Sequence, residues 1–482
     1  MKIDINETIL KKIGAIADKL DTDVFVVGGY VRDSLLNKNR FDIDCTVVGD
    51  SIKFAKIVAK EFKTKAVIYE RFRTALVPIG KTNIEFVGTR KEEYHSNSRN
   101  PITTEGTLED DLKRRDFTIN AMAASIRNNS NNYKFGEIID LFDGIKHLNE
   151  RLLITPLDPV ITYMDDPLRM MRAARFSSQL QFWIDRASID AITNLAERIQ
   201  IISKERIADE FMKIIASEKP SIGIYILQKT NLLKHILPEL QATIGIEQMS
   251  DKDGQIHHHK DVFHHTLLVL DNIAKVSDNI WFRLAGLFHD IAKPRTKRYI
   301  EGSGWHFFGH EEKGAKMVEP IFRKMKLPLE NIEYIKKLIR LHLRPAFLST
   351  DEITDSAVRR LAADAGDVLE DLLLLCKCDI TSKNPDLAQK YLNKFDVVAQ
   401  KVIDVQIKDK LREFQSPVRG DEIMELCNIP PSKMVGYIKT NIENAILDGI
   451  IPNEYDDAKA YFLSHKDEWL TADVSEFRII NI

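Results

Sequence analysis

The stretch VVGGYVRDSLLNKNRFDIDCTVVGD, residues 26–50, decides how the amino-terminal part of this chain folds and which chemistry it can perform. A short β-rich run ends at two glycines, a helix-forming segment follows, and a second β-rich run contains two aspartates with one residue between them. Aspartate is depleted in strands, so two of them in one strand need a reason other than local folding. Since side chains at i and i+2 share a strand face, Asp42 and Asp44 are predicted to point the same way, with Ile43 and Cys45 toward the core.

The shared face of Asp42 and Asp44 indicates a metal site. Two carboxylates a few ångströms apart repel each other unless a cation lies between them. Mg²⁺ prefers hard oxygen ligands and phosphate partners, and two metals held in this way can clamp the attacking and the leaving oxygen of a phosphoryl or nucleotidyl transfer. A D-x-D pair alone would also fit a polar strand end. The glycine turn that precedes it favours the metal site.

The Gly-Gly turn upstream fits a triphosphate. Gly28 and Gly29 let backbone N–H groups approach phosphate oxygens, and the N-terminus of the following helix favours negative charge. Arg32, one turn into that helix, can reach a phosphate, and Asp33 could hold Arg32 or interact with a ribose. Glu85, on a later β-rich run, could be a third acidic group at the metal site or a solvated strand residue.

The composition is that of a globular chain expected in a reducing cytosol. The chain has 482 residues, 44% hydrophobic and 29% charged, which is enough for more than one core. Its net charge of −3 argues against an all-over basic coat but allows a local basic surface. Four cysteines in a chain of this length are not a disulfide framework, and the lone C-x-C pair at 376–378 is weak for zinc. No apolar run is long enough to span a bilayer, and residues 1–20 predict an amphipathic helix rather than a signal peptide, so no membrane partner is expected.

Hydrophobic periodicity divides the chain into two kinds of structure. The first 150 residues alternate β-rich and helical segments and the remainder is helical, so the predicted fold class is an α/β head followed by all-α domains. A helix is expected over 109–124, a strand and turn over 136–148, and loops over 91–108 and 248–260. The expected strands are 24–29, 41–48, 65–70, 75–80 and 83–89.

Ordered motifs along the chain resemble one family. GGYVRDSLL and DIDCTVV are followed by LEDDLKRRDFTINAMA (108–123), DLFDGIKHL (140–148) and DDPLRMMRAARF (165–176). Together they resemble the class II tRNA nucleotidyltransferase and bacterial poly(A) polymerase family, of which CCA-adding enzymes are the best-known members. The resemblance implies a nucleotidyltransferase head of the DNA polymerase β type, followed by helical neck, body and tail domains.

The resemblance also implies roles for individual residues. It assigns triphosphate binding to the glycine turn, Mg²⁺ binding to the strand aspartates, ribose contacts to the R-R-D motif and recognition of the incoming base to the helix after residue 165. The implied nucleotide-binding residues are Gly28, Gly29, Arg32, Arg115, Asp116, Asn120, Asp166, Arg169 and Arg172, and the implied catalytic residues are Asp42, Asp44 and Glu85.

Base recognition by Asp166 and Arg169 is consistent with hydrogen-bond chemistry. The two residues are i and i+3, so they are expected to be neighbours on one helix face. A carboxylate accepts from an exocyclic amine, and a guanidinium donates to a ring nitrogen or carbonyl. Cytosine and adenine offer an amine there, whereas uracil and guanine would present a carbonyl to the carboxylate, so the pair predicts acceptance of C and A. A surface salt bridge between the two residues is the alternative. Asp165 stands where the family usually has Glu, and Arg206 could orient this helix or, as we prefer from the sequence, be ordinary surface charge.

A second constellation follows in the helical region. The segments DVFHHTLLVLD (261–271), GLFHDIAKP (286–294), HFFGHEEKGA (306–315), LIRLHLRP (338–345) and LCKCDITSKN (375–384) resemble an HD-domain metal site. Neutral imidazoles and carboxylates suit Mn²⁺, Fe²⁺, Ni²⁺ or Mg²⁺, and such a site can activate water for phosphoester hydrolysis. A purely structural domain is the alternative, and the basic run 293–298 could contact RNA or be a solvated loop. The candidate ligands are His265, His289, Asp290, His310, His342 and Asp379, with His264 a weaker candidate.

These observations predict a cytoplasmic, template-independent nucleotidyltransferase that adds CCA to tRNA 3′ ends from CTP and ATP, with a possible HD phosphohydrolase activity. A poly(A) polymerase or a CC- or A-specific enzyme is the alternative within the family, and an HD metal phosphohydrolase is the alternative of another class. The sequence does not set the oligomeric state. The predicted domains are a head (1–150), an RNA-binding helical neck (151–247), an HD metal-binding domain (248–385) and a helical tail (386–482).

Overall fold

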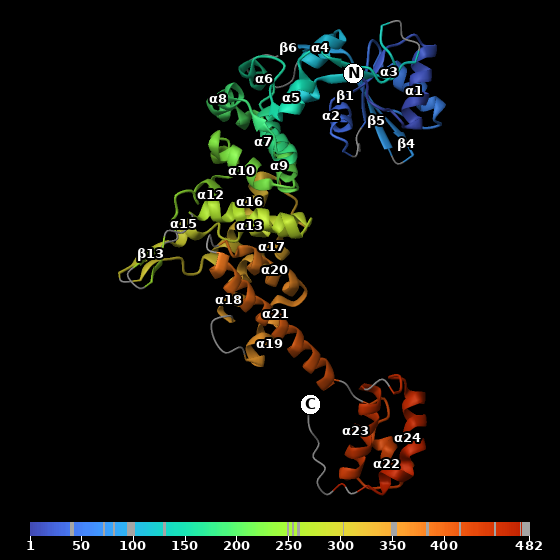
Figure 1. The fold of residues 1–482 in the computed structure, drawn as a ribbon, viewed down its shortest axis with the longest axis vertical. Coiled ribbons are helices and arrows are strands. Elements are labelled where there is room, and N and C mark those ends of the chain that lie inside the picture. The colour runs from blue at the N-terminus through green and yellow to red at the C-terminus, as the bar shows by residue number, and fades with distance from the viewer. Residues whose placement is uncertain are drawn as a thin grey trace. The chain divides into compact units, whose positions relative to one another are not determined.

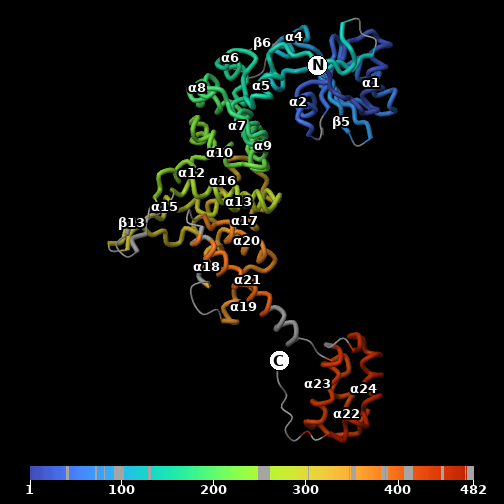
Figure 2. Tube along the Cα trace, in the orientation of Figure 1, coloured from blue at the N-terminus to red at the C-terminus, as the bar shows by residue number. Residues whose placement is uncertain are grey.

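The structure is a computed structural model in which the chain divides into two compact units. One unit comprises residues 1–343 with 370–388, and the other comprises 344–369 with 389–482. Each is described by itself below, and Figures 1 and 2 show the elements along the chain. The described residues are 1–38, 43–70, 73–80, 82–93, 102–128, 132–247, 250–252, 255–257, 261–301, 303–348, 354–381, 385–413, 416–447, 450–472 and 474.

The head of the first unit is built on a seven-stranded sheet with the order β3-β4-β5-β2-β1-β8-β9. Only β2 and β5 pair in parallel among these strands, and the other neighbours are antiparallel. All five strands expected between residues 24 and 89 are present, with slightly different ends. The strands are β1 (Val24–Val27), β2 (Ile43–Val47), β3 (Val67–Tyr69), β4 (Thr74–Ile79), β5 (Thr82–Gly88), β8 (Met122–Ser125) and β9 (Ile138–Asp140).

Alternation along the strands places different residues on the two faces of this sheet. Ile43 and Cys45 are buried in the large core cluster with helices on one face, as predicted. Phe25 and Val27 belong to a smaller cluster with Leu112 on the opposite face. Asp44 alternates with the core residues, so its side chain is on the Leu112 side of the sheet. The helices that contribute to the large cluster are α1 (Thr8–Lys19), α2 (Gly29–Leu35) and α3 (Ser51–Glu61).

Two expectations for the region between β5 and β8 are wrong. The helix expected over 109–124 stops early: α4 (Leu108–Lys113) is followed by the short helix η2 (Thr118–Asn120) and by β8. Small, fully buried residues such as Ala123 and Ala124 fit the strand β8 between β1 and β9, so sheet pairing overrides helix propensity here. The loop expected over 91–108 contains a hairpin of β6 (Arg90–Glu93) and β7 (Ile102–Glu105), and residues 94–101 lie outside the described residues.

The expected strand and turn over 136–148 are β9 and the start of α5 (Gly144–Glu150), after which helices dominate. Helix α7 packs against both α9 and α10, and its buried residues include Met170, Ala174 and Phe176. Two short strands, β10 (Leu152–Leu153) and β11 (Trp183–Ile184), pair in parallel beside it. The remaining elements are α6 (Pro159–Asp165), α7 (Leu168–Leu180), α8 (Arg186–Leu195), η3 (Ala196–Ile201), α9 (Lys204–Ile215), α10 (Pro220–Lys229), α11 (Leu233–Ile236) and α12 (Pro238–Gln241).

A second helical layer of the same unit is interrupted by a small sheet. The loop expected over 248–260 contains two strands, β12 (Ser250–Lys252) and β13 (Gln255–His257), which join a four-stranded sheet with the order β13-β12-β15-β14. Polar composition suggested a loop there, but pairing with a later segment makes a sheet. The other elements are α13 (Val262–Val276), α14 (Ile280–Phe288), α15 (Lys293–Thr296), β14 (Arg298–Ile300), β15 (Gly304–His306), α16 (His310–Met325), α17 (Ile332–Leu341) and α20 (Leu369–Asp379).

The second unit is helical in the part that the structure describes. Its carboxyl-terminal helices enclose a core that includes Phe462 and Trp469. The elements are α18 (Arg344–Leu348), α19 (Asp355–Ala365), η4 (Gly366–Val368), most of α21 (Pro385–Glu413), α22 (Gly420–Cys427), α23 (Lys433–Leu447) and α24 (Tyr455–Leu470).

Candidate active site and candidate metal centre

Asp44 and Glu85 lie directly opposite each other on the two parallel strands β2 and β5. Burial and the neighbouring charge of Asp44 raise the pKa of Glu85. A carboxylate pair of this kind fits a divalent cation, which would relieve the repulsion that raises the pKa. Asp42 lies outside the described residues, so the predicted position of its side chain stays a prediction.

At the glycine turn, the backbone of Gly28 lies close to the side chain of Arg115. Gly28 has a φ of +65°, which favours glycine, and a Cβ there would lie 2.9 Å from Nη1 of Arg115. Gly29 begins α2, and Arg32 follows within it. Asp33 accepts two hydrogen bonds from Arg32, at 2.8 and 2.9 Å. Of the two roles considered for Asp33, holding Arg32 is therefore the one that the structure shows. Arg32 also donates from Nη1 to Oδ1 of Asn120 at 2.8 Å.

Asp116 connects the head to helix α7. Its Oδ2 accepts from Nε of Arg172 at 2.7 Å, and its Oδ1 accepts from Nδ2 of Asn120 at 3.0 Å. Burial of Asp116 opposes its ionisation, but Arg172 and Asn120 outweigh burial and lower its pKa to about 2. A chain of contacts therefore runs from Arg32 through Asn120 and Asp116 to Arg172.

Asp166 and Arg169 do not lie on one helix face as predicted. Asp166 sits between α6 and α7 in an extended conformation, where its Oδ1 accepts from the backbone N–H of Leu168 at 3.1 Å. Proline at 167 follows it, and the residue before a proline is disfavoured in helical conformation, which explains the difference. Arg169 is buried and donates to the carbonyl oxygens of Arg114 at 2.6 Å and of Thr162 at 3.3 Å.

Arg206 has a more specific contact than surface charge. Its Nη2 lies 3.3 Å from Oδ2 of Asp166, so the salt bridge of Asp166 is to α9 rather than to Arg169. Together with the Leu168 N–H, this contact fixes the orientation of the Asp166 carboxylate. The sequence-based preference for an ordinary surface role was wrong for Arg206.

One pocket of about 290 Å³ collects most of these groups. It joins the strand that contains Glu85 to the start of α7, and its walls are rich in arginine, which fits an anionic ligand. Asn120 does not line the pocket but donates to the lining residue Asp116, and Arg32 in turn donates to Asn120. The lining residues are Thr74, Glu85, Val87, Arg90, Arg114, Arg115, Asp116, Asp166, Leu168, Arg169, Arg172 and Arg206.

Two supporting groups of this pocket were not predicted from the sequence. Asp111 is fully buried beneath it and pairs with Arg115 at 3.2 Å, which orients one of the arginines of the pocket. Phe176 lies under three guanidinium groups, those of Arg32, Arg172 and Arg175, at 5.1, 5.2 and 4.3 Å from its ring centre. The sequence did contain a signal for each group. Asp111 precedes Arg115 by four residues, and Phe176 follows Arg172 by four residues, so each pair is spaced as neighbours on a helix.

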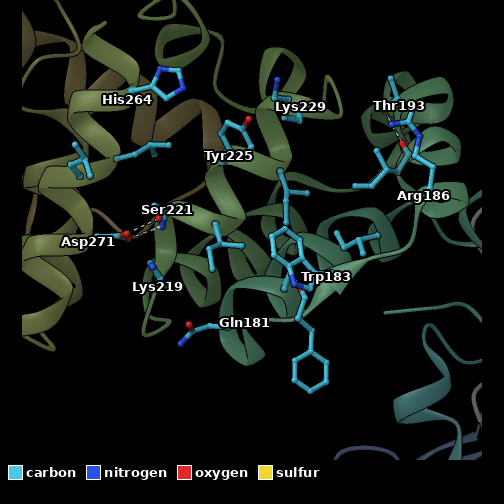
Figure 3. A pocket seen from close by; sticks show the side chains of 18 of the residues that line it. Gln181, Trp183, Arg186, Thr193, Lys219, Ser221, Tyr225, Lys229, His264 and Asp271 are labelled. Atoms are coloured by element: carbon cyan, nitrogen blue, oxygen red, sulfur yellow. Dashed lines mark hydrogen bonds between the residues drawn. The ribbon is translucent and has the colours of Figure 1, made fainter. Parts of the chain in front are cut away.

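A larger groove of about 1100 Å³ lies among β11, α8, α10 and α13. Trp183 and Tyr225 line it and are exposed, and Lys219 and Lys229 are also in its lining (Figure 3). Ser221 donates to Asp271 at 2.6 Å across the groove floor. The groove therefore combines aromatic and basic side chains.

All six predicted HD ligands come together. His265, His289 and Asp379 form one group, and Asp290, His310 and His342 form another, with the ligand atoms of each group within 4.8 Å of one another. Nε2 of His265 lies 2.8 Å from Oδ1 of Asp379, and Nε2 of His310 lies 3.2 Å from Oδ1 of Asp290.

The other ring nitrogen of each histidine is occupied. Nδ1 of His289, His310 and His342 lies 2.6–2.8 Å from the backbone carbonyls of Gly286, Phe307 and Ile339, so each Nδ1 donates, and in the neutral ring each Nε2 presents a lone pair. A lone pair facing a carboxylate is unfavourable without a shared cation. Oδ1 of Asp290, Oδ1 of Asp379 and Nε2 of His310 are correspondingly buried without hydrogen-bond partners among the described residues.

The charges of this cluster also indicate a site for a cation. Burial opposes protonation of His289, yet Asp290 and Asp379 raise its pKa to about 10. The negative field that would hold this proton can instead hold a metal, so the donor set fits a divalent cation. His264 is turned away from the cluster: its ring contacts Asp261 and more than half of its side chain is exposed. Cys376 donates to the carbonyl of His342 and belongs to neither group.

Family models match three consecutive parts of the chain. They are described as "Poly A polymerase head domain" (residues 24–154), "Probable RNA and SrmB- binding site of polymerase A" (181–244) and "HD domain" (262–382). None of the helices that the structure describes has the length and hydrophobicity needed to cross a membrane.

Relatives match over most of the chain. A CC-adding tRNA nucleotidyltransferase of Thermus thermophilus is 27% identical over 462 residues, covering 92% of this chain and 93% of that protein. A multifunctional CCA protein of Stenotrophomonas maltophilia is 30% identical over 350 residues, covering 70% and 79%. A solved tRNA nucleotidyltransferase in complex with a primer tRNA and an incoming ATP analogue shares the fold, with a TM-score of 0.57, 22% identity, and coverage of 82% of this chain and 99% of that one.

The polymerase-type head and its arginine-lined pocket define an enzyme of the nucleotidyltransferase class. The similarity extends through the helical regions and the HD domain. The chain belongs to the family of tRNA nucleotidyltransferases and poly(A) polymerases.

Proposed function

We propose that this enzyme adds cytidine and adenosine nucleotides, ending in CCA, to the 3′ end of tRNA. The single observation that supports it best is the pocket in which Glu85, beside the Asp44 strand, faces Asp166 and the arginines of α7. The strand carboxylates can act on the reacting phosphate, and Asp166 and the arginines of α7 can contact the base. One pocket can therefore bind both ends of an incoming nucleotide.

In the proposed reaction the 3′ oxygen of the RNA forms a bond to the α-phosphorus of the nucleotide. The bond from that phosphorus to the bridging oxygen of the β-phosphate breaks, and pyrophosphate leaves. Mg²⁺ bound to the strand carboxylates would stabilise the charge on the phosphate oxygens. Asp42 is the proposed acceptor of the hydroxyl proton, assisted by Glu85, while Gly28, Gly29, Arg32 and Arg115 bind the triphosphate.

Base selection is proposed for Asp166 and Arg169. The contacts to Leu168 and Arg206 leave the Asp166 carboxylate oriented as an acceptor, which suits the amines of cytosine and adenine. Arg169 uses only part of its donor set on backbone carbonyls and lines the pocket, so further N–H groups can face the base. Asp116, Asn120 and Arg172 would position the ribose and the base from the side.

The groove around Trp183 and Tyr225 is the proposed contact for tRNA. Most of its lining residues lie within the segment 181–244, which matches an RNA-binding family model, and its lysines suit a phosphate backbone. An enzyme that uses tRNA and nucleoside triphosphates works where both are present, in agreement with the cytoplasmic location that the sequence predicts.

Incorporation assays test this function. Purified protein would be given tRNA ending before CCA, after C and after CC, with CTP or ATP separately. We expect CTP uptake on the first two acceptors, ATP uptake on the third, and then termination. Uptake of CTP alone would instead place the enzyme with its CC-adding relative, and continued ATP uptake would make it a poly(A) polymerase.

A second activity, hydrolysis of phosphoesters at the HD cluster, is favoured by one observation: two groups of imidazoles and carboxylates converge, and Nε2 of His310 and carboxylate oxygens of Asp290 and Asp379 are buried without hydrogen-bond partners among the described residues. In hydrolysis a water oxygen bonds to phosphorus, the ester P–O bond breaks, and the leaving oxygen takes a proton. The proposed metals are Mn²⁺, Fe²⁺, Ni²⁺ or Mg²⁺. Bis(p-nitrophenyl) phosphate with each metal in turn tests this activity, and no turnover with any of them would reject it.

A further inference from the structure

The hairpin of β14 and β15 presents an exposed aromatic surface beside the HD cluster. We use the name aromatic hairpin for residues 297–301 and 303–308. Tyr299 is 60% exposed and lies directly opposite Trp305 in the strand register, with the two rings edge to face and their centroids 5.2 Å apart. Trp305 therefore supports the Tyr299 ring, and more than half of Tyr299 is open to a ligand.

Cations are interleaved with these rings. Nζ of Lys297 lies 4.1 Å from the Trp305 ring centre, and Nζ of Lys293 lies 5.4 Å from that of Phe307. Residues 293–308 contain four lysines and arginines and a single acid, Glu301. Alternating π faces and positive charges are the pattern of surfaces that bind unpaired nucleic acid strands.

Both ends of the segment that contains Tyr299 contact the HD cluster. Nζ of Lys293 pairs with Oδ2 of Asp290 at 2.7 Å, and the carbonyl of Phe307 accepts from Nδ1 of His310 at 2.7 Å. The exposed Tyr299 therefore lies between two residues of the segment, Lys293 and Phe307, that contact metal-ligating groups.

We propose that the aromatic hairpin binds an unpaired RNA strand, with a base stacked on Tyr299, and presents a phosphate of that strand to the HD cluster. The presentation step rests on the proposed HD hydrolysis, whereas the binding step does not. The interleaved cations and aromatic rings favour RNA as the ligand, because an unpaired strand offers phosphates and base faces together.

The opposite face of the hairpin provides a matched control. The strand register pairs Arg298 with His306, and the His306 ring stacks on Phe308 with an interplanar angle of 9°. Phe308 is 67% exposed, as open as Tyr299, but its ring packs on His306, whereas that of Tyr299 packs on Trp305. Removing each aromatic ring separately therefore tests whether RNA binding depends on the place of the Tyr299 ring or on exposed hydrophobic surface in general.

The experiment makes two measurements on the full-length protein. One is the Kd for a fluorescein-labelled six-nucleotide RNA, and the other is the inhibition constant of this RNA against hydrolysis of bis(p-nitrophenyl) phosphate. Stacking loss in Tyr299→Ala should raise the Kd and the inhibition constant about tenfold, while Tyr299→Phe should retain both. Phe308→Ala should leave the Kd within about twofold, as should Tyr69→Ala on the distant edge strand β3.

An unchanged Kd in Tyr299→Ala, or an equal loss in Phe308→Ala, would overturn the proposal. A wild-type sedimentation coefficient that reports a dimer, lost in Tyr299→Ala without any change in RNA binding, would identify the face as a protein interface and also overturn it. Absence of ester hydrolysis by the wild type would reject the HD activity alone, because the RNA Kd still tests the hairpin.

Discussion

The head pocket and the HD cluster have opposite chemistry. The described walls of the pocket contain several arginines, and two of its acids are paired with them, Asp116 with Arg172 and Asp166 with Arg206. The HD cluster contains imidazoles and carboxylates, and Lys293 pairs with Asp290 at 2.7 Å. The first arrangement suits a polyanion, with the strand carboxylates as the proposed metal ligands, whereas the second offers the proposed ligands of a metal within one cluster. One chain thus offers two phosphate chemistries that should be separable by mutation.

Asp44→Asn should have the largest effect on the head. Loss of a carboxylate opposite Glu85 removes charge stabilisation at the transferred phosphate, and nucleotide incorporation should fall by on the order of 10²–10³ or more. Rates of CMP and AMP addition measure it, with ester hydrolysis at the HD cluster as the internal control. Near-normal addition would contradict the metal assignment, and Asp42→Ala is expected to behave in the same way.

His289→Ala should have the largest effect on the HD cluster. The side chain contributes to one metal group and contacts both carboxylates, so metal affinity should fall more than about 100-fold, beyond the loss seen for supporting residues. Isothermal titration with Mn²⁺ measures affinity. His264→Ala is the matched control, since the His264 ring pairs with Asp261 and belongs to neither metal group. A parallel loss of nucleotide addition would show that the two sites are not independent.

Asp166→Ala should change selectivity more than rate. Without the oriented acceptor, discrimination of CTP and ATP against UTP and GTP should fall by on the order of 10². Ratios of kcat/KM for the four nucleotides measure it. Arg206→Ala, which removes only the orienting contact, should have a smaller effect in the same direction, and a larger one would reverse the proposed order of roles.

Thr107→Ala should have the smallest effect. Thr107 and Asp110 form a capping box at the start of α4, the helix that contains Asp111, and loss of an N-cap costs about 1 kcal/mol of stability. Thermal unfolding measures the shift in Tm. Thr107→Ser keeps the cap and should match the wild type, and metal affinity at the HD cluster should not respond to either change.

Much of both sites followed from residue order, because spacing encodes which groups share a strand or motif. The D-x-D strand placed Ile43 and Cys45 in the core, and the six HD candidates did converge. Contacts between distant segments were less accessible. Arg206 reaches Asp166 across 40 residues, and β8 replaces the end of an expected helix because sheet neighbours compete for it. The boundaries of the four predicted domains stay predictions.

The parallel pairing of β2 with β5 has a consequence for how the site comes into being. Every other pair in the head sheet is antiparallel, but the strand that contains Asp44 gains Glu85 as its neighbour only after α3, β3 and β4 have been made and folded between them. Non-local pairs of this kind form late, since loop closure must precede their contacts. A nascent chain that has released β2 alone therefore lacks the carboxylate pair, and the metal site proposed for this pair can form only once the head is assembled.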